Sequence, residues 1–417
     1  MTEICKFEDC TGCAACANVC AHSAIKMTAD DLGFMHPEIS QSLCVDCGVC
    51  YKTCPNNTTP DFHYPQQALA ACSADPKEQL SSTSGGIASV ISRQILSAGG
   101  VVYGCSGTDC ADVRHIRIDR EADIHLLKGS KYVQSYIGLV FRDIRRDLRE
   151  GKKVLFVGTP CQVAGLVSSI PNKLREELWT LDFVCHGVPS QQMLTESLLC
   201  VDSRGIELNF RVKKWKSGNL GKCHIVTEEN LDKCPVNSRY KTEYGLYAFK
   251  RGKEVLKESF PENNYIVGFL TGLLYRDSCY RCRYARAERV SDITLGDYHF
   301  DKTDSQHIEG ENRIISKVII NTERGAKLIE DVKPDINSTA IKYESLLKGN
   351  SQLMRPMRPH PLRDKFLAEF RLHGMAAASK ILAKDKLRIR YHLFINRMRD
   401  LLYSNSMLRN IIMHLKR

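Results

Sequence analysis

The sequence contains no hydrophobic run long enough to cross a bilayer. The nearest candidate, residues 266–275, falls well short of the roughly 18 residues that a membrane-spanning helix needs. Residues 1–10 include three acidic side chains and no apolar segment of the kind found in secretory signal peptides. We therefore expect an intracellular, cytoplasmic protein that does not span a membrane.

Several other features are also missing. With 417 residues, 43% of them hydrophobic and 26% charged, the composition excludes a disordered or fibrous chain and leaves room for two or three domains. No Ser/His/Asp or Cys/His arrangement typical of a hydrolase is found. Disulfide bonds are not expected, because intracellular thiols are kept reduced. The 19 cysteines are therefore expected to bind metal or to carry out redox chemistry.

The net charge of +11 is concentrated at the C-terminal end. Residues 361–417 contain thirteen Lys and Arg against four Asp and Glu. That segment accounts for nine of the eleven charges, so the rest of the chain is nearly neutral. A basic tail on a near-neutral body does not predict nucleic-acid binding.

Eight cysteines form two runs of the same pattern, C-x2-C-x2-C-x3-C, within residues 10–54. In this pattern three thiolates of one run bind one 4Fe-4S cluster and the fourth binds the other cluster. The predicted ligand sets are Cys10, Cys13, Cys16 and Cys54 for one cluster, and Cys44, Cys47, Cys50 and Cys20 for the other. Gly12 and Gly48 are expected where the backbone approaches inorganic sulfide. The alternative is a zinc module, but zinc sites usually pair two C-x2-C knuckles.

Residues 1–60 resemble a bacterial-type ferredoxin with two 4Fe-4S clusters, which implies an α+β ferredoxin-like module. The sequence departs from that pattern at Ala21, where a proline usually follows the fourth cysteine. Between the two runs, the apolar residues Ile25 and Met27 alternate with polar ones, and turn-forming residues follow at positions 30–33, before Phe34. This pattern predicts a short hairpin. A polar, proline-containing segment follows, and we place a linker at residues 61–67.

Short apolar strands alternate with helical stretches from residue 68 onward, which predicts an α/β domain with a mixed sheet over residues 68–350. A Ser/Gly-rich loop, Thr83 to Gly86, precedes a predicted helix at residues 87–96. Such a loop presents free backbone N–H groups to a phosphate, although a simple helix cap is an equally good role for Ser84.

Four cysteines outside the N-terminal runs follow predicted strands or form a knuckle. Cys161 follows strand 154–157, Cys185 follows strand 181–184, and Cys279 and Cys282 form a C-x2-C pair. Ligands bind at the carboxyl edge of parallel strands, and a thiolate is favoured at the start of a helix. Together these cysteines would complete a third four-thiolate site, whereas each alone suits an inert buried thiol.

Six motifs occur in the order seen in one family: residues 83–86, 129–132, 158–162, 185–189, 279–284 and 292–297. Over about residues 1–350 the sequence resembles the coenzyme F420 (deazaflavin) hydrogenase/dehydrogenase beta subunit family, in the bacterial branch with an N-terminal ferredoxin module. The resemblance implies FAD, which exchanges hydride with a deazaflavin and single electrons with clusters. It implies a third 4Fe-4S cluster at Cys161, Cys185, Cys279 and Cys282, and a flavin site that includes Thr83, Ser84, Gly85, Gly86, Ser130, Lys131, Gly158 and Thr159.

Three groups of polar residues leave alternatives open. Five arginines around the knuckle, at positions 276, 281, 283, 286 and 289, either hold an anion or tune a cluster, or they belong to a solvated loop. His186 is either a proton relay or a hydrogen-bonded loop residue. The basic residues around Trp215, at positions 211–216, are typical of the solvated face of a strand, so nucleic acid is not expected as a partner.

The tail, residues 351–417, is expected to be helical and basic. Leu387, Tyr391, Phe394, Met398 and Leu401 recur at helical spacing and form one apolar stripe. Such a helix suits an anionic membrane surface, an acidic partner, or closure over the body of the protein. The last of these is the expectation.

The sequence therefore predicts an iron–sulfur flavoprotein oxidoreductase with ferredoxin or other oxidoreductase subunits as partners. A link to polysaccharide biosynthesis follows from the resemblance alone. The competing hypothesis is a non-catalytic electron-transfer subunit without flavin. Seven cysteines have no partner spacing: Cys5, Cys72, Cys105, Cys110, Cys200, Cys223 and Cys234. Of these, Cys105 and Cys110 are the ones placed to compete for the third site.

Overall fold

The computed structural model describes residues 3–107, 112–198, 206–216, 223–226, 231, 234, 241–250, 253–298, 315–342, 344, 347 and 349–404. Within these residues, no helix is both long and apolar enough to span a membrane.

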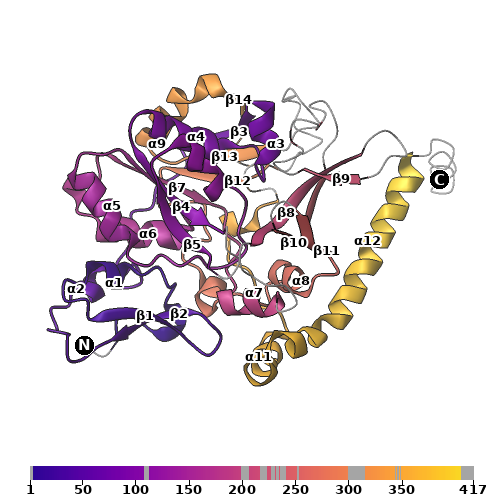
Figure 1. Ribbon diagram of the computed structural model, residues 1–417, viewed down its shortest axis with the longest axis horizontal. Helices are drawn as coiled ribbons and strands as arrows, with labels where there is room; N and C mark the ends of the chain where they lie inside the picture. The colour runs from indigo at the N-terminus through magenta and orange to yellow at the C-terminus, as the bar shows by residue number, and fades with distance from the viewer. Residues whose placement is uncertain are drawn as a thin grey trace.

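A small N-terminal module carries the two cysteine runs (Figure 1). Its elements are a 3-10 turn (Phe7–Asp9), helix α1 (Ala15–Val19), strands β1 (Ile25–Ala29) and β2 (Met35–Ile39), and helix α2 (Val49–Thr53). The two strands pair antiparallel, so the predicted hairpin is present. Its turn forms because the Asp30 carboxylate accepts hydrogen bonds from the N–H groups of Leu32 and Phe34, at 2.9 and 2.8 Å.

The main domain is built on an eight-stranded mixed sheet of order β14-β3-β13-β12-β7-β6-β4-β5. The strands are β3 (Gln67–Ser73), β4 (Val101–Ser106), β5 (Arg114–Ile118), β6 (Val154–Val157), β7 (Leu178–Phe183), β12 (Ile293–Asp297), β13 (Ser316–Ile320) and β14 (Ile336–Ala340). The central strands β4, β6, β7 and β12 run parallel, and the outer pairs are antiparallel. The carboxyl ends of β6 and β7 therefore meet at one edge of the sheet.

Both faces of this sheet are covered, which explains why its central strands are rich in apolar residues. Helices α4 (Ile87–Ser97) and α9 (Glu323–Asp331) pack on one face. Helices α5 (Val140–Arg149) and α6 (Pro160–Ser169) pack on the other, and α1 of the N-terminal module shares their core. Shorter elements connect these layers: α3 (Pro76–Ser81) and the 3-10 segments Glu121–Leu127 and Asn172–Leu174. The N-terminal module is thus packed directly onto the α/β domain.

A second, antiparallel sheet of order β11-β10-β8-β9 lies beside the first. Its strands are β8 (Ile206–Lys216), β9 (Cys223–Ile225), β10 (Lys241–Lys250) and β11 (Lys253–Ser259), and it packs near helices α7 (Gln191–Ser197) and α8 (Asn264–Leu270). The longest apolar stretch of the sequence, residues 266–275, lies mostly in the buried α8 and the turn after it. This apolar stretch is therefore part of the hydrophobic core.

The tail forms α11 (Arg363–Ala378), a 3-10 turn (Ser379–Leu382) and α12 (Ala383–Ser404). Helix α11 buries Phe366, Leu367 and Phe370 in the core shared with α7, α8 and the small sheet. Helix α12 then runs along the outer edge of the molecule (Figure 1). The first half of the tail therefore closes over the body.

The residues predicted as a linker are held by the body of the protein. His63 and Arg289 exchange backbone hydrogen bonds of 2.8 and 2.9 Å, and β3 already begins at Gln67. The guanidinium of Arg286 lies over the ring of Phe62, 4.5 Å from its centroid. This segment therefore follows a defined path between the two modules.

Replacing Phe366 with Ala is expected to destabilise the protein by about 3–5 kcal/mol, because its fully buried ring leaves a cavity between α11 and the core. Leu372 lies on the same helix and is 74% exposed, so Leu372→Ala should cost less than about 0.5 kcal/mol. Urea unfolding of the anaerobically purified protein, followed by tryptophan fluorescence, measures both. Equal effects would contradict the packing of α11.

Candidate metal centres

The eight cysteines of the N-terminal module surround two hollows. Cys10, Cys13, Cys16 and Cys54 line the first hollow, and Cys20, Cys44, Cys47 and Cys50 line the second. The structure thus brings the cysteines together in the two sets that their spacing predicts. Each helix contributes a cysteine to both hollows. Cys16, within α1, lines the first hollow, and Cys20, at the end of α1, lines the second. Cys50, within α2, lines the second hollow, and Cys54, at the end of α2, lines the first.

Both cysteine loops turn through left-handed backbone at the same two positions. These are the second and fourth residues after the first cysteine: Gly12 and Ala14 in one loop (φ +66° and +60°), and Asp46 and Gly48 in the other (φ +52° and +70°). The sequence predicted a close backbone approach at Gly12 and Gly48, which are two of these four left-handed positions, and did not single out Ala14 or Asp46. A non-glycine residue in this region costs roughly 1 kcal/mol, and such strain persists where the surroundings fix the loop.

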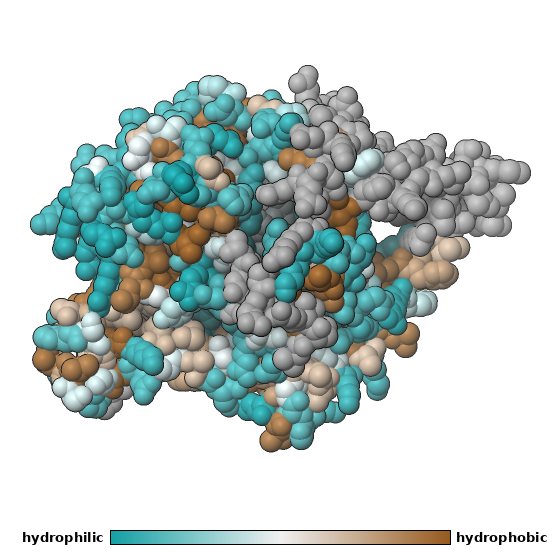
Figure 2. Space-filling model, in the orientation of Figure 1, coloured by the Kyte–Doolittle hydropathy of each residue, from teal (hydrophilic) through white to brown (hydrophobic). Residues whose placement is uncertain are grey.

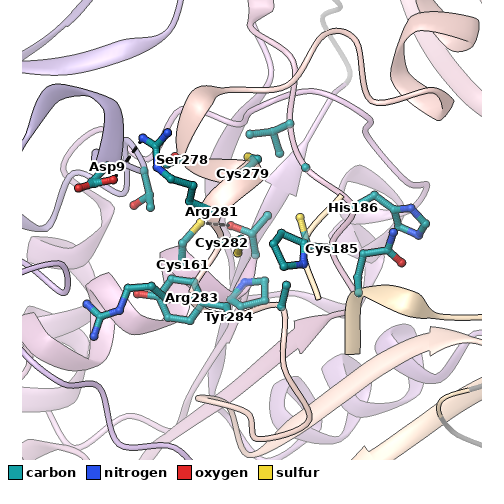
Figure 3. A pocket seen from close by; sticks show the side chains of 18 of the residues that line it. Asp9, Cys161, Cys185, His186, Ser278, Cys279, Arg281, Cys282, Arg283 and Tyr284 are labelled. Carbon is teal, nitrogen blue, oxygen red and sulfur yellow. Dashed lines mark hydrogen bonds and ion pairs between the residues drawn. The ribbon is translucent and has the colours of Figure 1, made fainter. Parts of the chain in front are cut away.

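A third set of thiols surrounds a pocket of about 250 Å³ at the carboxyl edge of β6 and β7. Cys161 lies in the first turn of α6, and Cys185 follows β7. Cys279 lies within the 3-10 turn Asp277–Arg281, and Cys282 comes directly after it. Figure 3 shows the four sulfur atoms arranged around a common centre. The structure thus brings together the four cysteines that the sequence places on three separate loops.

The start of α6 is fixed by its capping residues, which sets the direction of Cys161. The Gln162 side-chain oxygen accepts a hydrogen bond from the Thr159 N–H at 3.0 Å, and Pro160 occupies the first helical position. The Thr159 hydroxyl lies 3.2 Å from Cys161 Sγ. His186 also lines the pocket, but its ring points away from the four sulfur atoms in Figure 3.

The thiols of this pocket are hard to ionise on their own. Burial and the neighbouring Cys282 raise the pKa of Cys279 to about 12. Burial, followed by the neighbouring thiols Cys279 and Cys161, raises the pKa of Cys185 well above its usual value. Bound metal favours the thiolate form, so loading of such a site releases protons.

The geometry suits clusters better than single ions. Among the residues that the structure describes, no three His, Cys, Asp or Glu side chains converge to hold one metal ion. A zinc ion draws its cysteine sulfurs to about 2.3 Å, whereas an iron–sulfur cluster is ligated at separate corners. The cysteines surround spaces rather than a point, which fits the second arrangement.

The third pocket adjoins the first hollow. Thr11 and Asn56 line both spaces. Helix α6 also touches the first cysteine loop, because a Cβ added to Gly165 would lie 2.8 Å from Cys13 Sγ. Gly165 is one helical turn after Cys161, so a single helix contacts both sites.

The knuckle arginines hold the N-terminal module against this pocket. The buried Arg276 donates to the carbonyl of Cys10 at 2.5 Å and to that of Met35 at 3.0 Å. Arg281 reaches the Glu8 carbonyl and the Asp9 carboxylate at 3.1 and 3.3 Å, and Arg283 reaches the Pro55 carbonyl at 2.6 Å. Figure 3 shows the Arg281 contact. Their role here is docking, which neither sequence alternative included.

The other two arginines of that group have different partners. Arg286 pairs with Glu288 at 2.8 Å. Arg289 is buried, and it pairs with the buried Asp182 at 3.1 Å. The second pair ties the end of β7 to the segment that leads into β12.

The residues predicted for the flavin site separate into two places. Ser130 donates its N–H to the Thr83 hydroxyl at 3.1 Å, and the Gly85 N–H donates to Ser316 Oγ at 2.9 Å. Gly86 begins α4 with φ +83°. Gly158 and Thr159 instead flank the third thiol pocket, which Thr159 lines. Gly158 is close to the Phe156 ring.

Lys131 is half-buried and makes capping contacts. Its ammonium group donates to the carbonyls of Leu127 and Lys128 at 2.9 and 2.5 Å, at the end of the 3-10 segment Glu121–Leu127. Burial lowers its pKa. The structure therefore shows a structural contact for this residue, and its predicted role toward a flavin stays a prediction.

Sequence reasoning missed a group of buried and half-buried cations beside the Thr83–Gly86 loop. Lys213, 5% exposed, donates to the carbonyls of Gln79 and Ser84. Arg211 pairs with Asp297 at 2.7 Å, and Lys128 pairs with Glu78 at 2.9 Å. The expectation of a solvated strand face at residues 211–216 is therefore wrong for Arg211 and Lys213. The strand alternation was visible in the sequence, but the contacts of this strand with Gln79, Ser84 and Asp297 were not.

The unassigned cysteines have varied surroundings. Cys5 lines the first hollow, and the Asn56 amide donates to its sulfur at 3.8 Å. Cys105 packs with the core of the small sheet instead of lining the third pocket. Cys72 and Cys234 are buried. Cys110, Cys200 and the Cys223 side chain lie outside the described residues.

A module with two four-cysteine hollows, joined to an α/β domain, defines an iron–sulfur protein of the electron-transfer class. A family model described as "4Fe-4S dicluster domain" matches residues 9–58, and a model of the C-terminal part of the coenzyme F420 hydrogenase/dehydrogenase beta subunit matches residues 151–344. Residues 151–344 thus match the C-terminal part of the coenzyme F420 hydrogenase/dehydrogenase beta subunit family, and a 4Fe-4S dicluster domain precedes them. The resemblance in the sequence is thereby confirmed.

No curated protein matches the chain. Among solved structures, one match is a chain of the F420-reducing NiFe hydrogenase complex from Methanosarcina barkeri, from a study of xenon derivatization. It is 14% identical, and the match covers 78% of this chain and 95% of that chain with a TM-score of 0.37. A TM-score this low supports no argument about fold or function.

Replacing Gly165 with Ala tests the contact between α6 and the first cysteine loop. Helix propensity alone predicts that this change raises the free energy of unfolding by about 1 kcal/mol. The added methyl group would instead collide with Cys13 Sγ, so we expect a net loss of stability. Ser168→Ala on the same helix is the control and should not destabilise the protein. Anaerobic thermal unfolding of the purified holoprotein decides the sign, and a higher melting temperature for Gly165→Ala would contradict the contact.

Proposed function

We propose that this chain is an iron–sulfur flavoprotein oxidoreductase. It moves electrons between a hydride-type carrier at FAD and a one-electron partner such as ferredoxin, through three 4Fe-4S clusters. The deazaflavin named in the family's description is the first candidate for the hydride carrier. The setting is a reducing, intracellular compartment, where these thiols remain free to bind metal.

The observation that carries the proposal is the serial arrangement of the three thiol-lined spaces. The second hollow reaches the surface, where Cys47 is exposed. Helices α1 and α2 connect it to the first hollow, because each helix supplies a cysteine to both. The first hollow shares the walls Thr11 and Asn56 with the third pocket. Electrons therefore have a continuous path from the surface to the carboxyl edge of the large sheet.

In this proposal the cysteine sets act as ligands as the sequence predicts. The donor chemistry fits, because at least four thiols line each space and no oxygen ligand is needed. A flavin exchanges two electrons as hydride, and each 4Fe-4S cluster carries one electron. Arg276 and its neighbours keep the first and third spaces adjacent.

The flavin site is proposed at the loop Thr83–Gly86 and the cations beside it. The amino end of α4 offers free N–H groups there. Lys128, Lys213 and Arg211 outnumber the carboxylates Glu78 and Asp297 that pair with them. An excess of positive charge with little exposure to water is costly unless an anion balances it, so a diphosphate group suits this place.

The alternative is an electron-transfer subunit without flavin, in which the α/β domain only positions the clusters. The family description and the module support an iron–sulfur electron carrier equally in both cases. A role in polysaccharide biosynthesis stays a prediction. Flavin content separates the two functions.

Anaerobically purified protein is expected to contain about twelve iron and twelve sulfide per chain, together with one FAD. Cys161→Ser should lower the iron content to about eight, because it removes a ligand of the third site. Cys105→Ser is the matched control and should retain about twelve. Eight iron and no flavin in the unaltered protein would leave only the N-terminal module as a redox unit.

The affinity for FAD is expected to fall as the pH rises above about 7. Burial and the neighbouring Arg211 lower the pKa of Lys213 to about 7, so its amine loses its charge in this range. A bound diphosphate favours the protonated amine, so binding takes up a proton and weakens by up to about tenfold per pH unit above that value.

Titration of flavin-depleted protein with FAD, followed by flavin fluorescence, measures this dependence. Lys213→Met should remove it, whereas Lys333→Met, on an exposed site, should preserve it. A pH-independent affinity between pH 6 and about 9 in the unaltered protein would argue against a diphosphate beside Lys213.

A further inference from the structure

Helix α12 presents an apolar stripe to the outside of the molecule. Leu387, Tyr391, Phe394 and Met398 are 68, 62, 59 and 40% exposed. They recur every three or four residues, so they form one line about 16 Å long. Figure 2 shows brown and tan surface along this outer edge, where Figure 1 places α12.

The opposite side of α12 holds the helix to the body. Ile389 packs against the core of the small sheet. Lys386 donates to the Glu262 carbonyl at 2.6 Å and to Asn264 Oδ1 at 3.0 Å, and Arg390 binds the Glu262 carboxylate. The expectation that the predicted stripe closes over the body is therefore wrong for α12. A different face of the helix contacts the body of the protein, and the stripe faces outward.

The outward stripe is bordered by positive charge. At about 100° per residue, Lys384, Arg388 and Arg399 fall on the flank away from Glu262, and all three are exposed. Arg390 borders the other flank. Asp385, the acidic residue of the first turn, lies on the inner side, 3.6 Å from His360. The outer surface of α12 is therefore apolar along its centre and cationic along its edge.

This arrangement matches the chemistry of an anionic bilayer surface. Apolar and aromatic side chains enter the boundary between headgroups and acyl chains, and long basic side chains reach back to the phosphates. The tail holds nine of the protein's eleven net positive charges, which adds attraction to an anionic leaflet. A helix already fixed to the body needs no ordering on binding, which lowers the entropic cost.

We propose that α12 docks the protein on an anionic lipid surface through Leu387, Tyr391, Phe394 and Met398, with Lys384, Arg388 and Arg399 on the lipid phosphates. This surface is independent of the redox sites. The redox centres would then operate at the membrane face, within reach of partners held there.

Vesicle flotation of the full chain tests the proposal. The protein is expected to float with vesicles of equal parts phosphatidylglycerol and phosphatidylcholine, and at least about tenfold more weakly with phosphatidylcholine alone. Leu387→Gln with Phe394→Gln should weaken anionic binding by about tenfold or more, because two large apolar side chains no longer leave water. Arg388→Gln with Arg399→Gln should reduce both the binding and its sensitivity to salt.

Leu372→Gln is the matched control, since Leu372 is an exposed leucine of α11, outside the stripe, and its replacement should leave flotation unchanged. Iron content and the visible spectrum should be the same in every variant, which separates this test from the redox proposal. Failure to float with anionic vesicles would overturn the proposal. So would stripe-dependent self-association in lipid-free light scattering, because the occupant would then be a second copy of the chain.

Discussion

The arrangement of the three cysteine-lined spaces depends on one buried guanidinium. Arg276 directly precedes the turn Asp277–Arg281, which carries the knuckle of the third pocket. Its side chain crosses into the N-terminal module and donates to the carbonyls of Cys10 and Met35. Its backbone N–H is bound to the Val188 carbonyl at 3.0 Å, just after Cys185. One residue therefore links the first cysteine loop, the knuckle and the loop that follows β7.

Other contacts reinforce this junction from the opposite side. Arg142, at the start of α5, donates to the carbonyls of Asn18 and Cys20 at the end of α1. The Gln134 amide donates to the Thr11 carbonyl at 2.9 Å. Carbonyls of a cysteine-rich loop are satisfied here by side chains of the α/β domain, so the module is a fixed part of the protein rather than a tethered carrier.

The sequence predicted what depends on spacing along the chain. The two cysteine sets, the hairpin at residues 25–34, and the strands that lead to Cys161 and Cys185 all follow from local pattern. It did not predict the contacts that join distant segments. Gly165 against Cys13, or Lys213 beside Ser84, involves residues more than 100 positions apart, and neither has a periodic signal. The burial of Lys213 and the pairing of Arg211 depended on distant partners, Gln79, Ser84 and Asp297. The direction of the stripe on α12 depended on which face of the helix contacts Glu262.

The exchange of cysteines between α1 and α2 has a consequence for how the module is assembled. Each short helix would supply one ligand to each cluster, so neither cluster is complete until both helices are in place. Binding at one hollow therefore pre-organises the other, and a half-loaded module gains less than half of the stability that full loading confers. The module is expected to fill, and to be lost under oxidative damage, as a single cooperative unit.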